Sequence, residues 1–148
     1  MDITETKPDP SRLVRVLVVE DNRHLAAMIQ AGLRSAIHRD LDDAVAVAFR
    51  TAEDGHTALE LLRREAFDAL VVDVYLPGLD GPHVIAQARN ELGLTKLSIV
   101  AMSAGGDAAR NAALSAGANI FIDKPIRVGR FTDELTRLLQ INARSWDN

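Results

Sequence analysis

The sequence contains no cysteine, which excludes disulfides, zinc–thiolate sites and catalysis by a thiol. No apolar run approaches the roughly 20 residues that a membrane-spanning helix needs. The N-terminus is polar and lacks the apolar segment of a secretory signal. A net charge of −4 and a pI near 5.5 differ from the basic excess of nucleic-acid-binding proteins. These absences fit a cytoplasmic protein without a nucleic-acid or membrane partner.

The 148 residues, of which 47% are hydrophobic and 26% charged, suit one globular domain. The first 12 residues carry two prolines and mixed charge, and we expect them to form a flexible leader. We therefore predict a leader over residues 1–12, one domain over residues 13–142 and a C-terminal tail over residues 143–148.

Short valine-rich and isoleucine-rich runs alternate five times with segments whose apolar residues recur at helical period. This pattern predicts an α/β fold in which helices cover both faces of a parallel sheet. The predicted strands are residues 14–20, 44–50, 70–73, 97–103 and 119–123, and the predicted helices are residues 23–37, 56–64, 82–91, 107–115 and 128–140. The last helix should bury Val128, Phe131, Leu135 and Leu138.

Polar side chains end four of the five predicted strands. Glu20 and Asp21 follow the first strand, Asp73 ends the third, Ser103 ends the fourth and Lys124 follows the fifth. Open parallel sheets bind ligands outside the carboxyl ends of their strands, where the strand order reverses. Three carboxylates, a hydroxyl and an ammonium at that edge can together hold a divalent cation and a phosphoryl group.

These residues stand in a recognisable order. Glu20 and Asp21, the segment DVYLPGLDG from Asp73 to Gly81, Ser103 and the Lys124–Pro125 pair resemble the receiver domain of bacterial response regulators, the CheY-like superfamily. The resemblance covers residues 13–142 and is to the single-domain type. It implies a flavodoxin-like (βα)5 three-layer sandwich with parallel strands in the order 2-1-3-4-5.

The resemblance implies a role for each residue at the sheet edge. Asp73 would accept the phosphoryl group as a nucleophile, with Lys124 and Ser103 contacting the phosphoryl oxygens. A cis peptide bond is expected before Pro125. The competing interpretations are an Asp73 that only bonds loop amides, a solvated surface Lys124, and a Ser103 hydroxyl that bonds its own backbone.

The resemblance also implies a Mg²⁺ site made of oxygen ligands. Asp21 would bind the ion directly and Glu20 through water, and Asp73 and the backbone carbonyl of Tyr75 would complete the set. The family often has aspartate where this chain has Glu20. The competing interpretation is that Glu20 and Asp21 only cap the following helix.

Four positions match regulatory sites of the family. Ser103 and Phe121 match the switch residues, although the family more often has tyrosine where this chain has Phe121. Phe121 could instead fill a gap in the core. Tyr75 and Gly105 match positions that tune the lifetime of the phosphoryl group.

We therefore expect a response regulator of a two-component or phosphorelay system, a phosphoacceptor that catalyses its own phosphorylation and dephosphorylation and is not a conventional enzyme. The donor would be a sensor histidine kinase or a histidine phosphotransfer protein. The output surface would be the fourth helix, fifth strand and fifth helix of a monomer or a weak phosphorylation-dependent dimer.

Three alternatives remain open from the sequence. The chain could be a receiver-like scaffold or localisation module that works without phosphorylation, or a receiver fragment of a larger kinase or transcription factor. A phosphatase or flavin protein of similar fold is disfavoured, because the first strand–helix junction, from Glu20 to Arg23, lacks the glycines of a phosphate-binding loop.

Overall fold

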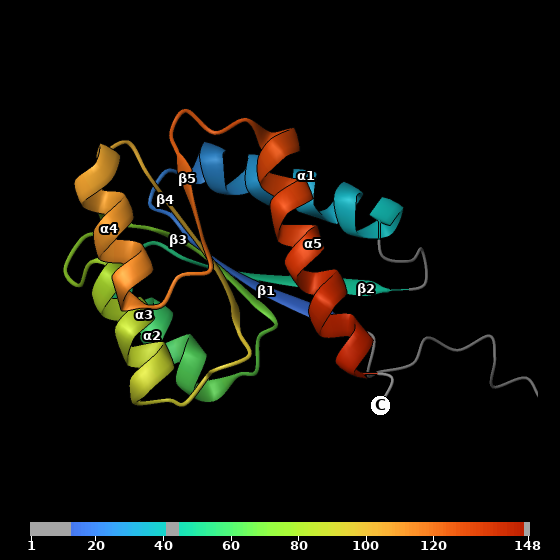
Figure 1. Ribbon diagram of the computed structural model, residues 1–148, viewed down its shortest axis with the longest axis horizontal. Coiled ribbons are helices and arrows are strands. Elements are labelled where there is room, and N and C mark those ends of the chain that lie inside the picture. The colour runs from blue at the N-terminus through green and yellow to red at the C-terminus, as the bar shows by residue number, and fades with distance from the viewer. Residues whose placement is uncertain (1–12, 41–44, 147–148) are drawn as a thin grey trace, which may run out of the picture.

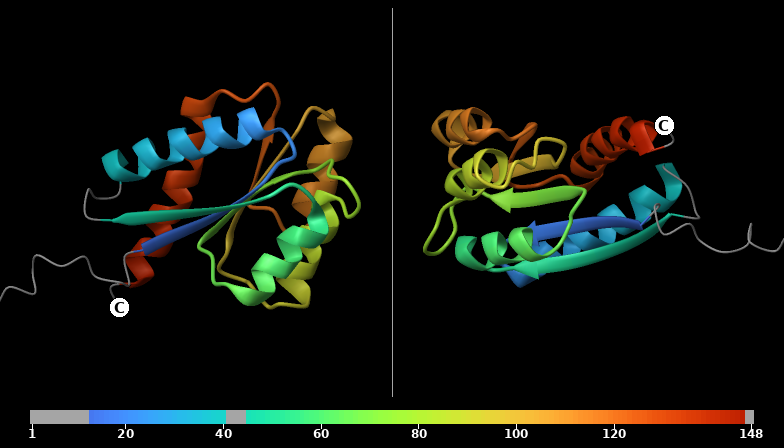
Figure 2. Two further views of the ribbon diagram at one scale, coloured as in Figure 1. Left: turned by 180° about the vertical axis from the view of Figure 1, so that it is seen from behind. Right: turned by 90° about the horizontal axis from the view of Figure 1, so that it is seen from below.

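The computed structural model describes residues 13–40 and 45–146 as a parallel five-stranded sheet between two layers of helices (Figure 1). The strands lie in the order β2-β1-β3-β4-β5, which confirms the predicted flavodoxin-like (βα)5 topology. They are β1 (Leu13–Val19), β2 (Ala46–Ala52), β3 (Ala69–Asp73), β4 (Ser98–Ser103) and β5 (Ile120–Asp123). One face is covered by α1 (Arg23–Asp40) and α5 (Val128–Trp146), and the other by α2 (Gly55–Arg64), α3 (Gly81–Asn90) and α4 (Gly106–Ala116), as both views of Figure 2 show.

The core explains the continuous apolar runs of the central strands. Every residue of β3 and β4 is buried, because helices cover both faces of the sheet. Successive side chains alternate between the faces: Leu17 and Val72 pack toward α2, α3 and α4, whereas Val18 and Val71 pack toward α1 and α5. Burial of each such side chain contributes roughly 1.5–3 kcal/mol. Within the described residues, no helix has the length and apolarity needed to cross a bilayer.

The strand register places the polar strand ends side by side. Val19 of β1 pairs with Val72 of β3, so the next residues, Glu20 and Asp73, lie at one level. Ser103 of β4 pairs with Asp123 of β5, which brings Lys124 to the same edge of the sheet. The backbone N–H of Lys124 also donates to the Ser103 carbonyl at 2.9 Å.

Three predicted elements differ from the structure by two residues or more at an end, and the other ends agree to within one residue. β2 begins and ends two residues later than predicted, because its pairing with β1 carries it to Ala52, opposite Val19. α1 continues to Asp40, and α5 continues to Trp146, through part of the segment predicted as a tail over residues 143–148. No proline or glycine follows Gln140 to end α5. The predicted leader, residues 1–12, lies outside the described residues.

The buried stripe of α5 was predicted partly wrongly. Phe131, Leu135 and Leu139 are fully buried, whereas the predicted residues Val128 and Leu138 are only half-buried. The three buried residues are four positions apart, a spacing that keeps them on one helical face. The predicted step from Leu135 to Leu138 was one residue too short for this face.

Gly81, at the end of the DVYLPGLDG segment, is required by a close backbone contact. A Cβ atom on Gly81 would lie 2.3 Å from the carbonyl oxygen of Asp73. Its N–H donates to the Val74 carbonyl at 2.8 Å, and the Asp80 side chain caps α3 by accepting from the His83 N–H at 3.0 Å. The start of α3 is thereby held against the backbone of Asp73.

We expect Gly81→Ala to lower the free energy of unfolding by roughly 1–3 kcal/mol, because the added methyl group overlaps backbone atoms that cannot move independently. Urea unfolding followed by circular dichroism measures the change. The matched control is Gly129→Ala in α5, where an added Cβ meets no atom within 4 Å and should not destabilise the protein. A Gly81→Ala protein as stable as the unmodified protein would contradict the close contact.

Candidate functional site

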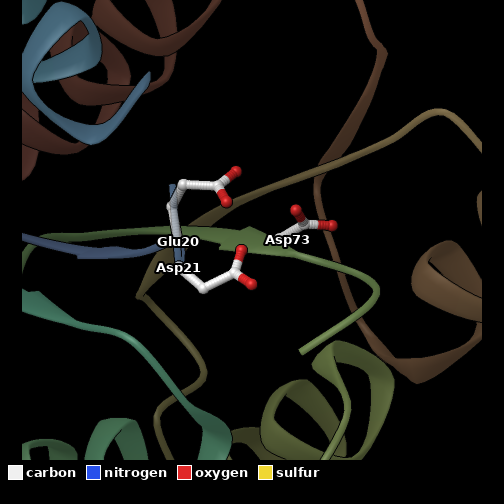
Figure 3. A group of neighbouring side chains, drawn as sticks. All are labelled: Glu20, Asp21 and Asp73. Atoms are coloured by element: carbon white, nitrogen blue, oxygen red, sulfur yellow. The ribbon is translucent and has the colours of Figure 1, made fainter. Parts of the chain in front are cut away.

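Three carboxylates converge at the carboxyl edge of the sheet, as Figure 3 shows. Glu20 and Asp21 directly follow β1, and Asp73 ends β3. One oxygen from each lies within 4.8 Å of the others. Glu20 is 2% exposed and Asp73 5%, whereas Asp21 is exposed to solvent. Two of the three negative charges are therefore removed from water and need a compensating group.

Lys124 supplies this compensation. Its Nζ donates to Asp73 Oδ2 at 2.5 Å and to Glu20 Oε1 at 2.9 Å. The peptide bond between Lys124 and Pro125 is cis, as the resemblance implied. The competing interpretation of Lys124 as a solvated surface lysine is therefore wrong.

The environment of Lys124 acts on its pKa in two opposing ways. Partial burial disfavours the ammonium, but the hydrogen bonds and charges of Asp73 and Glu20 outweigh burial and raise the pKa above its ordinary value of 10.5. The stabilisation that this raised pKa represents is fully present below pH 10.5, and it is lost as the pH rises through the higher pKa of the folded protein.

Backbone amides bind the remaining oxygens of both buried carboxylates. The Tyr75 N–H donates to Asp73 Oδ1 and the Asn22 N–H to Glu20 Oε2, each at 3.0 Å. The Asn22 side chain caps α1 by accepting from the Leu25 N–H at 3.1 Å. Since Asn22 provides this cap, helix capping does not explain the carboxylates of Glu20 and Asp21.

Ser103 ends β4, and Tyr75 lies on the loop that follows Asp73. Ser103 is 1% exposed, and its Oγ accepts from the Gly105 N–H at 2.9 Å, so in this structure the hydroxyl bonds its own loop. Tyr75 is 62% exposed, and a Cβ on Gly105 would lie 2.6 Å from the Tyr75 hydroxyl oxygen. Gly105 therefore makes room for the tyrosine ring above the edge of the sheet.

Phe121 lies in β5 and is half-buried against the cluster between the sheet and α2, α3 and α4. This position agrees with the core interpretation, and the switch role stays a prediction. The contact between Lys124 and Glu20 was missed: Glu20 was assigned only to the metal and Lys124 only to the phosphoryl oxygens. The sequence signal for this contact was that both residues stand at the carboxyl ends of predicted strands, which lie at one edge of a parallel sheet.

The donor set fits a divalent cation that prefers oxygen ligands. Three carboxylates against one ammonium leave a net charge of −2, and the exposed Asp21 keeps the site open to solvent. Mg²⁺ binds such carboxylates while retaining several waters. Glu20, Asp21 and Asp73, which the sequence singled out as ligands, are brought together.

Comparisons with known proteins agree on one family. The family model described as the response regulator receiver domain matches residues 16–136 of this chain. The chain is 31% identical over 147 residues to the Autoinducer 2 sensor kinase/phosphatase LuxQ of Vibrio vulnificus, covering 97% of this chain and 16% of the relative. It is 32% identical over 128 residues to the response regulator MprA of Mycolicibacterium vanbaalenii, covering 86% of this chain and 51% of the relative.

A similar solved structure is the receiver domain of a sensor histidine kinase from Pseudomonas aeruginosa, which has a magnesium ion coordinated in its active-site cleft. Its TM-score is 0.71 at 29% identity, and the match covers 86% of this chain and 98% of that domain. The chain spans about half or less of the length of the two curated relatives.

We expect Lys124→Met to lower the free energy of unfolding by roughly 2 kcal/mol in EDTA, because it leaves Glu20 and Asp73 without a counter-ion; the loss is less than for a fully buried pair because the Lys124 side chain is 24% exposed. Added Mg²⁺ should recover part of the loss. Urea unfolding with and without Mg²⁺ measures both effects.

Arg63→Met, which removes an exposed cation from α2, is the control and should change stability little. The stability difference between the Lys124→Met variant and the unmodified protein should persist at neutral pH and be lost only as the pH rises through the pKa of Lys124 in the folded protein, which lies above 10.5. Equal stability of these two proteins at neutral pH would contradict the role assigned to the ammonium.

Proposed function

The chain belongs to the response regulator receiver domain family, and we propose that it accepts a phosphoryl group from a phosphohistidine onto Asp73 and signals through phosphorylation-dependent contacts with other proteins. The observation that carries this proposal is the position of Asp73. Its buried carboxylate is held between a lysine ammonium at 2.5 Å and a loop amide at 3.0 Å, with two further carboxylates beside it. This environment orients an ionised nucleophile and provides groups for a phosphoryl oxygen.

In the proposed reaction, an Asp73 oxygen forms a bond to phosphorus as the bond between phosphorus and the donor's imidazole nitrogen breaks. The imidazole nitrogen takes the electron pair. Lys124 holds Asp73 before transfer and contacts the phosphoryl oxygens afterwards. A divalent cation held by Asp21, Asp73, the Tyr75 carbonyl and, through water, Glu20 would supply neutralisation of the phosphoryl charge. Attack by water on phosphorus would later break its bond to the Asp73 oxygen, release inorganic phosphate and regenerate the Asp73 carboxylate.

Signalling in this proposal begins at Ser103. Its hydroxyl accepts from the Gly105 N–H, which leaves its own hydrogen able to donate to a phosphoryl oxygen. That bond would draw the loop between β4 and α4 toward Asp73. Gly105 and Gly106 stand at the start of α4, and Gly106 has a positive φ of 67°, so this junction suits a hinge. Phosphorylation would thereby shift an existing equilibrium between two conformations of the protein. These conformations would differ in the loop between β4 and α4 and in the switch residue Phe121.

The partners follow from the same chemistry. The donor is a sensor histidine kinase or a histidine phosphotransfer protein, and relatives that carry the names of sensor kinases and response regulators support this class. The downstream target binds the surface formed by α4, β5 and α5. We propose a two-component or phosphorelay role in the cytoplasm, self-catalysed phosphorylation and dephosphorylation, and a monomer or a weak phosphorylation-dependent dimer.

We expect Asp73→Asn to abolish phosphoryl uptake from acetyl phosphate or phosphoramidate with Mg²⁺ present, because an amide cannot form the acyl phosphate. Mass spectrometry of the intact protein measures the uptake. Asp133→Asn, an exposed position on α5, is the control and should label normally. Full labelling of the Asp73→Asn variant would refute Asp73 as the acceptor. An unmodified protein that takes up no phosphoryl group would favour the phosphorylation-independent scaffold.

We expect Tyr75→Ala to shorten the lifetime of the phosphoryl group several-fold, because the exposed ring beside Gly105 screens one approach of water to Asp73. Tyr75→Phe, which keeps the ring, should retain the original lifetime. Loss of label after removal of the phosphodonor measures the rate. If the alanine variant loses phosphate no faster than the unmodified protein, the ring does not shield the site.

A further inference from the structure

A hollow of about 240 Å³ lies between α4 and α5, away from the carboxylates of the candidate site. All four residues of β5, Ile120–Asp123, line it, together with Pro125. Figure 1 shows β5 at the margin of the sheet with α4 on one side and α5 on the other. The hollow is therefore a groove whose floor is the last strand of the sheet.

The groove exposes the edge of β5 and not one of its faces. Side chains of a strand alternate between the two faces, so four consecutive residues line one hollow only where the edge itself faces it. β5 pairs with β4 on one side, and the sheet order ends at β5. Among the described residues, no backbone–backbone hydrogen bond outside the sheet involves β5. Such an edge is a template for a further strand.

The walls of the groove carry excess positive charge. Arg110 comes from α4, Arg130 from α5 and Arg127 from the segment before α5, and all three are exposed. No ion pair within the described part of the chain involves these three arginines. Asp123 and Glu134 also line the groove, so three cations face two anions on a protein whose net charge is −4. The groove is thus a locally basic site on an acidic protein.

We propose that this groove binds an acidic segment of a partner protein in extended conformation, added as a strand to the free edge of β5. Main-chain hydrogen bonds to β5 would provide affinity, and carboxylates of the segment would pair with Arg110, Arg127 and Arg130. Half-buried Phe121 and Ile122 offer apolar contact to alternate side chains of the segment. The inference rests on the proposed function, because it assigns the chemistry of the downstream partner.

The two carboxylates favour a peptide over nucleic acid. Asp123 and Glu134 would repel the continuous phosphates of a nucleic acid, whereas an acidic peptide can carry an occasional lysine or amide opposite them. The groove also lacks an exposed aromatic ring on which a base could stack, since its one aromatic lining residue, Phe121, is half-buried.

The test uses the full chain and a short fluorescein-labelled peptide in which glutamate and valine alternate, followed by fluorescence anisotropy. We expect binding of this peptide that weakens as salt is added, and no binding of a matched peptide with lysine in place of glutamate. Two versions N-methylated on one or the other set of alternate amides test strand addition. One of them should lose binding, because its donors toward β5 are blocked.

Arg110→Glu and Arg130→Glu should each lower the affinity for the acidic peptide by about tenfold, since charge reversal replaces attraction by repulsion. The control Arg63→Glu makes the same change on the distant helix α2 and should have no effect. Equal binding of both N-methylated peptides, unchanged affinity of both groove variants, or tighter binding of a single-stranded oligonucleotide would overturn the inference. So would self-association of the chain that the same substitutions abolish, which would assign the groove to a second copy.

Phosphoryl uptake from acetyl phosphate, measured on the same samples, separates this inference from the proposed function. Groove variants that take up phosphate normally yet bind the peptide as the unmodified protein does would overturn only the inference that the groove binds the peptide. A protein that binds the peptide as expected but takes up no phosphate would overturn only the phosphoacceptor role.

Discussion

The contact of the Lys124 ammonium with Asp73 and Glu20 holds together the carboxyl edge of the sheet. It joins residues that follow or end β5, β3 and β1, which are far apart in the chain and are not all neighbours in the sheet. Two carboxylates this deeply buried would be costly without a counter-charge. The ammonium and two loop amides provide that charge, while the exposed Asp21 leaves the site open toward solvent.

This arrangement depends on strand register and on close backbone packing. A shift of one residue in β1 or β3 would reverse which faces their side chains occupy and would separate Glu20 from Asp73. The loop after β3 is held by Gly81, whose missing Cβ lets α3 begin against the Asp73 carbonyl. The fold thus provides a fixed set of charged groups, beside which Tyr75 lies on the loop after β3 and Ser103 ends β4.

Much of this could be predicted from the sequence, because the informative residues are local signals. Apolar runs that end in Asp73 or Lys124 indicate both a buried strand and its carboxyl end, and the alternation with helices gives the parallel sheet. The errors lie where tertiary contacts decide. The limits of β2 follow from pairing with β1, the buried face of α5 includes Leu139, and the Glu20–Lys124 contact arises only when strands that are not sequence neighbours meet.

The candidate site and the groove share one short stretch of backbone. Asp123 lines the groove, Lys124 reaches Asp73, and Pro125 lines the groove again. The Lys124 N–H is bonded to the carbonyl of Ser103, so the ends of β4 and β5 are coupled directly. If a phosphoryl group on Asp73 draws Lys124 and Ser103 toward it, as in the proposed function, the residues on either side of Lys124 must adjust. In the proposed function, a change at Asp73 therefore reaches the edge of β5 through the ion pair with Lys124 and the peptide bonds that join Lys124 to Asp123 and Pro125.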